Sequence, residues 1–564
     1  MEGSRSLLSR SAVGISADRH YADRVLSHSR CETVKTPHPG PHYWNLANYL
    51  CSAFDSLEII SDRERGSLSQ PRPYARLHRL SARLSSSLNL AGAEDMQAIG
   101  TDELISGEEN HVLFMQGHPS PSWLNAIGAK YRIDPEFWLQ HLDFRASVGR
   151  PDHFSLPGLP SKRTHFIRLR SSTIGHRDLG ARFVDQRAVD KLRDEAAQGM
   201  KKYFRALKRA SGWQVGDMIV REFSVLDGRH SMFEQDISIF TKEIGHGWIA
   251  VIWSDCGTPV WGAPWYEGSF AATKWMPTVQ YWPDIALEES RGVEVPAPPG
   301  SMVQSAQHLP YLGDQLKDTD LARRIPALAL EGIFSHVAAS ESQVLNLLQT
   351  KIDSVRDPKR MVEEKNPTLL NLLHYQRIIE RHLDRIKENL TAVEKFIESV
   401  PRTDVNETQK TTATVILKAL LEDFAHLKTR AEYMLGQCNG GMTIIMNNAM
   451  LRESQRAIEQ AATVTKLTKL AFVFIPLSFV CAFFGMNSRE IDNGQLSIWV
   501  FFAVAMPIVL LSILMMQVEK QQIQRLAAKC RSMYKVTRNS EDATTTGPKQ
   551  VDTFDLRTMS EPMV

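Results

Sequence analysis

The sequence is poor in several features that mark large classes of protein. It has six cysteines among 564 residues, and they are scattered, with no CxxC pair. Such spacing argues against a disulfide framework and a zinc site, and it fits a reducing compartment. The formal net charge is +2, which gives no reason to expect a nucleic-acid partner. The sequence has no apparent ATP-binding loop, so an ATP-driven pump is not indicated.

An apolar run is also missing from the N-terminal region. The first 35 residues carry five arginines among many serines. This composition is faintly like that of a mitochondrial transit peptide, but Glu2, Asp18 and Asp23 interrupt it. We therefore interpret the segment as a disordered cytosolic tail. Poor order is expected over residues 1–100 as a whole.

Residues 101–320 mix strand and helix patterns and predict a cytosolic α/β domain. Ser122 and Asp134 stand before helical patterns, and Pro135 follows Asp134 in the first turn of its helix. The predicted strands lie at residues 111–115, 165–170, 217–226, 231–242 and 247–254. The last three strands are expected to form an antiparallel meander.

From residue 321 the apolar period changes from two to 3.6, which predicts long helices over residues 321–441. One amphipathic helix is expected at 367–400 and another at 407–437. The sequence Asn439-Gly440-Gly441 is expected to end the second of them. A stalk helix that continues into the first transmembrane helix is then predicted over residues 442–484.

Two apolar runs near the C-terminus predict a transmembrane hairpin. The first ends at Phe484, the second is residues 498–516, and the polar loop 485–497 joins them. About 19 residues of helix span ~28 Å, close to the ~30 Å hydrocarbon core of a bilayer. Lysines precede the first span and six basic residues follow the second, whereas the loop has only Arg489. The positive-inside rule therefore places both termini in the cytosol. The tail, residues 517–564, is expected to be basic and then disordered.

The first span holds few polar side chains. Lys466 and Lys469 precede it and must reach the inner boundary of the membrane or face a wet lumen. A two-helix hairpin cannot enclose a pore alone, so conduction would require a ring of several copies. Small or polar positions for such a ring are Thr463, Ser478 and Ala482. The Ser478 hydroxyl has an equally good alternative partner in its own helix, a carbonyl one turn back.

The run from Leu470 to Asn487, which ends in Gly485-Met486-Asn487, resembles the CorA family of magnesium transporters, in the version found in fungal members. In that family a GMN motif ends the first of two C-terminal spans, and a long cytosolic helix runs into that span. Residues 117–144 also resemble the cytosolic domain of fungal CorA-like proteins. Over residues 410–520 the resemblance is close, and over 110–400 it is looser.

The resemblance implies a homopentamer with an α+β cytosolic domain, long helices and a two-helix transmembrane hairpin. Five copies of the GMN motif would form the outer mouth, where the Asn487 amides would meet hydrated Mg²⁺. Val464 and Leu467 would form a hydrophobic constriction. By position, the pore-lining residues are Ala461, Val464, Leu467, Ile475 and Ser478, and the mouth residues are Gly485, Met486 and Asn487.

The chemistry of Mg²⁺ agrees with such a mouth, because this ion keeps its waters and is served by neutral oxygens. Glu490 and Asp492 in the outer loop would concentrate cations there. Two departures from the family pattern stand out. Arg489 lies in a loop where many relatives have a Met-Pro-Glu type sequence, and Ala461 stands where several carry a polar residue. The metal-sensing carboxylates of bacterial members cannot be placed in this chain.

The sequence therefore predicts a divalent-cation channel, not an enzyme, that needs no cofactor and carries Mg²⁺ inward. Co²⁺, Ni²⁺ and Zn²⁺ stay open as further ions. The plasma membrane is the expected location, with the vacuolar and mitochondrial inner membranes as alternatives. A second hypothesis is a non-conducting, membrane-anchored sensor or interaction protein. A membrane-bound enzyme has little support, because His230, His246 and Asp236 lack ligand spacing and are interpreted as turn and surface residues.

Overall fold

The computed structural model divides the chain into two compact units, Met1–Ile445 and Met446–Val564. We describe each unit by itself. The described residues are 17–31, 40–55, 74–81, 86–143, 166–178, 185–209, 213–258, 270, 273–280, 304–312, 319–356, 367–398, 407–485 and 502–514.

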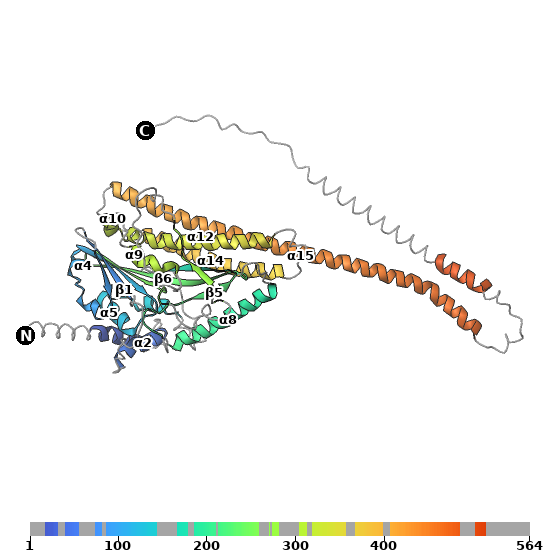
Figure 1. The fold of residues 1–564 in the computed structure, drawn as a ribbon, viewed down its shortest axis with the longest axis horizontal. Coiled ribbons are helices and arrows are strands. Elements are labelled where there is room, and N and C mark those ends of the chain that lie inside the picture. Colours follow the sequence, from blue (N-terminus) through green and yellow to red (C-terminus); the bar gives the residue numbers. More distant parts are fainter. Residues whose placement is uncertain are drawn as a thin grey trace, which may run out of the picture. The chain divides into compact units, whose positions relative to one another are not determined.

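The first unit is built on one sheet (Figure 1). Among the described residues its strand order is β2-β1-β3-β7-β6-β4-β8, and β5 pairs with β6 beside this path. The strands are β1 (Ala75–Ser81), β2 (Ser86–Leu90), β3 (Glu109–Gln116), β4 (Phe166–Arg177), β5 (Glu222–Val225), β6 (His230–Ile244), β7 (Gly247–Ser254) and β8 (Thr273–Met276). The β3–β7 pair is parallel and the other pairs are antiparallel.

The strand predictions were correct where the apolar pattern is local. β3 and β7 lie where the sequence placed strands, and β7 has the predicted bounds. The predicted strand at 217–226 is reduced to the four residues of β5. The consecutive antiparallel pairings expected of the meander are confirmed, because β5 pairs with β6 and β6 pairs with β7. The sequence did not predict that β4 pairs with β6 and that β3 pairs with β7. These pairings join segments far apart in the sequence, which local periodicity does not report.

Alternate residues of the central strands face two separate cores. In β7, Ile249 and Val251 belong to one core, and Ala250 and Ile252 to the other. The same alternation holds in β3. All four β7 residues are fully shielded from solvent. The sheet is therefore covered on both faces, as the predicted α+β domain with long helices requires.

Shorter helices and α8 cover the first face. They are η1 (Gly40–Tyr43), α2 (Trp44–Asp55), α3 (Asp95–Ala98), α4 (Asp102–Ser106), α5 (Pro121–Tyr131), α6 (Pro135–His141) and α8 (Gln186–Arg209). Asp134 caps α6 as predicted, and its side chain accepts from the Glu136 amide at 2.9 Å. The cap of α5 is Ser120 and not Ser122, because Pro121 already occupies the first helical turn.

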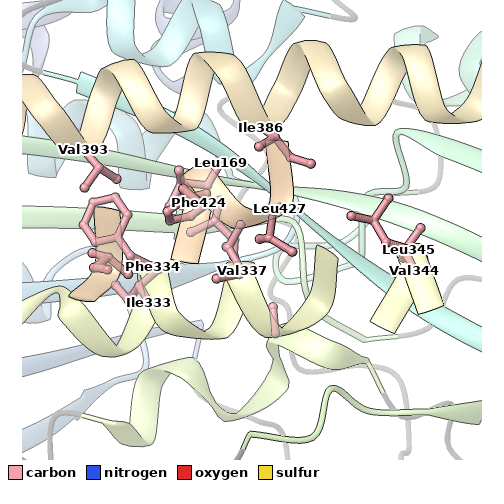
Figure 2. Close-up of a cluster of buried hydrophobic side chains, with 14 of the residues drawn as sticks. Leu169, Ile333, Phe334, Val337, Val344, Leu345, Ile386, Val393, Phe424 and Leu427 are labelled. Atoms are coloured by element: carbon pink, nitrogen blue, oxygen red, sulfur yellow. The ribbon is translucent and has the colours of Figure 1, made fainter. Parts of the chain in front are cut away.

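Long helices cover the second face (Figure 1). The long helices are α12 (Glu331–Val355), α14 (Pro367–Glu398) and α15 (Glu407–Gly485). They are preceded in the chain by the short elements η6 (Ser305–His308), α9 (Leu309–Leu312), α10 (Thr319–Arg324) and α11 (Pro326–Ala329). Figure 2 shows Phe424 and Leu427 of α15 among side chains of α12 and α14, together with Leu169 of the sheet. The predicted helix at 367–400 is confirmed as α14.

The N-terminal region differs from the poor order expected over residues 1–100. Residues 17–29 form a helix, and its Ala22 and Val25 are buried in the first core. The Tyr21 hydroxyl donates to the Ile133 carbonyl at 3.0 Å. A Cβ at Gly128 would lie 2.5 Å from the Tyr21 ring, so this contact requires glycine. Arginine- and serine-rich flanks hid this short apolar stripe from sequence analysis.

α15 also differs from the expectation, because it does not end at Asn439-Gly440-Gly441. It is one helix of 79 residues that passes through both glycines and Pro476. A glycine inside a helix costs about 1 kcal/mol relative to alanine, and many flanking helix formers can outweigh that cost. The stalk expected to begin at Met442 is therefore the later part of a helix that begins at Glu407.

Candidate functional site

One described helix is long and apolar enough to cross a membrane. It is the Lys410–Ala482 part of α15, and 6% of its apolar window is buried. Such low burial is unlike that of a core helix in a soluble domain. The second predicted span is described as the shorter apolar helix Phe502–Leu514. The remaining residues of 498–516 lie outside the described part of the chain.

The five predicted pore positions share one face of α15. With 100° of rotation per residue, Ala461, Val464, Leu467, Ile475 and Ser478 fall within a sector of about 120°. Their side chains are exposed, with 60% of Val464, 61% of Leu467 and 68% of Ile475 accessible. Among the described residues of this sector in the apolar segment, Ala471 is partly buried and the others are exposed.

The opposite face of the same segment is shielded. Its partly or fully buried residues are Val473, Pro476, Leu477 and Val480. Their mean direction lies about 170° from that of the predicted pore positions. The helix Phe502–Leu514 has a matching stripe, made of Ala505, Ile508, Val509 and Ser512. Residues spaced by three and four positions form one side of a helix, so each of these two stripes lies on one side of its helix.

The two lysines near the first span are also turned away from the predicted pore face. By the same rotation, Lys466 and Lys469 lie on the side of the shielded stripe. Both side chains are exposed. Of the two alternatives that the sequence left open for them, this placement favours the inner boundary of the membrane over a wet lumen.

Hydroxyl groups along this part of α15 differ in their partners. Thr463, Thr465 and Thr468 each donate to a carbonyl four residues earlier, at 2.7 to 3.0 Å. The Ser478 hydroxyl makes no hydrogen bond with any residue that the structure describes, although the sequence offered it such a carbonyl. It therefore keeps its hydrogen-bonding capacity on the predicted pore face.

The predicted mouth is described only at its first residue. Gly485 is the last residue of α15. Met486, Asn487, Glu490 and Asp492 lie outside the described residues.

A network of buried charges lies elsewhere, in the first unit. Its members come from the sheet, the segments beside it and the helices over it. They are His141, Asp143, Arg168, Arg170, Arg221, Glu234, Asp236, Asp255, Glu341, Arg381 and His382. Strands β4 and β6 pair so that Arg170 lies opposite Asp236. Side chains two residues apart on a strand point to the same face, so Arg168 and Glu234 share this face.

Asp236 is the centre of this network, so its interpretation as a surface residue is wrong. Its carboxylate lies 2.7 Å from Arg168 Nε, 2.8 Å from Arg170 Nε and 3.3 Å from Arg221 Nε. Burial would raise the pKa of Asp236, but the three guanidiniums outweigh it and hold that pKa well below its usual range. Alternating charges in both strands were the sequence signal for this cluster. His246 does lie in a turn, as predicted.

One end of the network is at Asp255. Arg221 binds both Asp255 oxygens, at 2.6 and 2.8 Å. His141 Nε2 lies 3.0 Å from Asp255 Oδ1, and its ring stacks on Trp253 with centroids 3.9 Å apart. Burial lowers the pKa of His141 despite the pull of Asp255, which favours a neutral ring.

The other end of the network reaches the helical layer. Arg381 of α14 lies 2.6 Å from Glu234. His382 stands between Glu341 of α12, at 2.7 Å, and Glu234 of β6, at 3.6 Å. Burial would lower the pKa of His382, but Glu341 and then Glu234 outweigh it and raise that pKa. Four arginines face five carboxylates, so a protonated His382 makes the network neutral.

This network is suited to holding the layers together and not to binding a metal ion. Each carboxylate in it already faces an arginine or histidine. Among the described His, Cys, Asp and Glu side chains, no group of three or more is placed to hold a metal ion. The predicted ion pathway and the charged network are therefore separate features.

Comparison with known proteins finds a family similarity in the C-terminal part of the chain. Residues 303–520 match the family model described as CorA-like Mg2+ transporter protein. Among solved structures, the complete structure of the CorA magnesium transporter from Methanocaldococcus jannaschii has 10% sequence identity and a TM-score of 0.35, covering 78% of this chain and 96% of that chain. No curated protein matches the chain. The family match includes α12, α14, α15 and every predicted pore and mouth residue.

Proposed function

We propose that the chain belongs to the CorA family, whose model matches residues 303–520, and that it is a membrane channel for divalent cations, with Mg²⁺ as the transported ion. Members of that family are transporters and not enzymes. The observation that carries the proposal is the two-sided character of α15. Its predicted pore positions are exposed and share one face, while the lysines and the shielded stripe lie on the other.

In the proposed assembly five copies bring the exposed faces together around an axis. The helix Phe502–Leu514 packs on the shielded stripe and forms the outer ring of a two-helix hairpin. Val464 and Leu467 narrow the pathway with apolar side chains, which can stop ions by excluding water. Ser478, whose hydroxyl has no partner within its own helix, offers an oxygen to a hydrated ion between this constriction and the mouth.

The mouth consists of Gly485, Met486 and Asn487 from each copy. Mg²⁺ gives up its water reluctantly, so amide oxygens of Asn487 bind the hydrated ion from outside its first shell. Glu490 and Asp492 raise the local cation concentration. With both termini in the cytosol, influx is driven by the membrane potential, which supplies ~2.3 kcal/mol per charge per 100 mV. Co²⁺, Ni²⁺ and Zn²⁺ are further candidate ions, and the plasma membrane is the proposed location.

Ion flux into liposomes tests this proposal. Purified chain should admit Mg²⁺ when the interior is negative, and Asn487→Ala should reduce the flux at least tenfold. Leu467→Ala should raise the leak because it widens the constriction. Leu470→Ala is its matched control, because Leu470 lies outside the pore sector. If the wild-type chain admits no divalent ion, the non-conducting sensor is the better description.

A further inference from the structure

A pair of histidines at one end of the sheet has the geometry of metal ligands. His176 is the residue before Arg177, the last residue of β4, and His230 begins β6 directly opposite His176. The Arg177 amide donates to the Arg229 carbonyl at 2.7 Å, so the histidines form a non-hydrogen-bonded pair, in which side chains approach most closely. His176 Nδ1 lies 3.3 Å from His230 Nε2, and the ring centroids are 5.0 Å apart.

These distances fit two imidazoles that share an ion. With metal–nitrogen bonds of about 2.0–2.1 Å and a tetrahedral angle, two ligand nitrogens lie about 3.3 Å apart and their ring centres about 5.2 Å apart. A linear N–H···N hydrogen bond of the same length would separate the ring centres by about 5.6 Å. The observed separation is closer to the first arrangement. Both rings are half-buried, so water can reach the open coordination positions.

Asp227 supplies the outer support that histidine ligands usually have. Its Oδ1 lies 3.1 Å from His230 Nδ1, the ring nitrogen that points away from His176. A carboxylate at this place fixes the proton on Nδ1 and leaves the Nε2 lone pair for a metal. The same Oδ1 accepts from the backbone amides of Arg229 and His230, which holds the carboxylate in position.

We propose that His176 and His230 form a two-histidine site for a transition-metal ion of the Zn²⁺, Ni²⁺ or Co²⁺ class, with Asp227 orienting His230 and water completing the coordination. Imidazole suits these ions, whereas Mg²⁺ prefers oxygen ligands. The site therefore distinguishes such ions from Mg²⁺. It does not depend on whether the chain conducts.

Lys351 near the end of α12 competes with metal at this site. Its Nζ lies 2.9 Å from His230 Nδ1 and 2.6 Å from Asp227 Oδ2. When Lys351 donates to Nδ1, the ring proton is on Nε2 and blocks the metal. Metal binding moves this proton to Nδ1, so Lys351 must leave His230 while it keeps Asp227. Binding thus changes how the end of α12 is held to the β5–β6 turn.

The remaining charges near the pair are mostly positive and limit its affinity. Arg177 follows His176 in β4, Arg229 precedes His230 in the turn before β6, and Lys274 of β8 lies opposite His176. Arg177 donates to the Gly228 carbonyl at 2.7 Å, which directs its guanidinium to the turn. Removing the charge of Lys351 should therefore strengthen metal binding, which a role in turn structure alone would not predict.

Titration of the full chain in lipid nanodiscs with Zn²⁺, with the heat of binding measured by calorimetry, tests the proposal. His176→Ala and His230→Ala should each lose one Zn²⁺ per chain or bind it at least tenfold more weakly. His246→Ala is the matched control, because this exposed histidine lies in the turn at the other end of β6. Lys351→Met should bind Zn²⁺ at least threefold more tightly, and excess Mg²⁺ should not compete.

The visible absorption of bound Co²⁺ gives a second readout, because it changes when a nitrogen ligand is lost. His230→Gln is included as a milder variant, and melting temperatures identify any variant that fails to fold. If both histidine variants keep the wild-type number and affinity of Zn²⁺ ions, the proposal is wrong. It is also wrong if Lys351→Met weakens binding. Neither result bears on Mg²⁺ flux, so the channel proposal is tested independently.

Discussion

Arg170 is held by two buried carboxylates, and its removal would take one guanidinium partner from each of them. Its guanidinium lies 2.8 Å from Asp236 and 3.0 Å from Glu234. Breaking a buried ion pair from one side costs about 3–5 kcal/mol. We expect Arg170→Met to lower the free energy of unfolding by about that amount, measured by chemical denaturation of the purified chain.

The control for Arg170 is a matched exposed pair. Lys191 lies 3.9 Å from Glu195 on α8, and 79% of its side chain is accessible. Exposed pairs of this kind contribute about 0.3–0.5 kcal/mol, so Lys191→Met should change stability little. Equal effects of the two substitutions would show that the network does not stabilise the domain.

His382 should make stability depend on pH above the ordinary histidine range. Glu341 and Glu234 face its ring from α12 and β6, Arg381 precedes it on α14, and the raised pKa favours its charged form. A raised pKa contributes stability that is complete below the unfolded value of 6.5 and is lost as pH rises through the folded value. As pH rises above 6.5, the melting temperature of the wild type should therefore fall more than that of His382→Gln. Equal pH dependence of the two proteins would contradict the charged form.

The two glycines inside α15 give a prediction about a single element. A Cβ at Gly440 would meet nothing within 4 Å, whereas at Gly441 it would lie 3.0 Å from Leu372 Cδ1. Gly440→Ala should therefore stabilise the helix by about 1 kcal/mol, and Gly441→Ala should gain less. Melting temperatures of the two variants make the comparison. A larger gain at Gly441 would mean that α15 is not packed against α14 there.

Elements were predictable from sequence where a local pattern decides them. β7 and α14 show clear periods of two and 3.6, and Asp134 with Pro135 marks the start of α6. α8 was missed although its apolar residues recur every three to four positions, at Val189, Leu192, Ala196, Met200, Tyr203 and Leu207. β1 could not be found locally, because it owes its place to pairing with β3.

The candidate site divides in the same way. Helical rotation alone places the predicted pore positions on one face, so the sequence was sufficient for that part. The charged network needed the pairing of β4 with β6, and the His176–His230 pair needed the same register. His230 was interpreted as a turn residue because its partner is 54 positions away in the chain.

At the scale of the whole molecule, a ring of copies would bring equivalent charges together, so that their electrostatic potentials add near the axis. Glu453 lies on the predicted pore face, below Ala461, whereas Glu459 lies outside that sector. In a closed ring the Glu453 carboxylates gather near the axis and attract cations. Glu453→Gln should therefore reduce Mg²⁺ flux into liposomes several-fold, and Glu459→Gln should not. Equal fluxes would indicate that this part of α15 does not line the pathway.

Because α15 is one unbroken helix, the number of residues between two of its positions decides whether their side chains share a face. One alanine inserted between Ala462 and Thr463 would turn Glu453 by about 100° relative to Ser478, while eleven helical residues would turn it by only about 20°. The short insertion should therefore impair flux as Glu453→Gln does, and the long one should spare it. Homologous helices should accordingly differ in length by whole numbers of helical turns, because only such differences keep the pore-facing residues on one face.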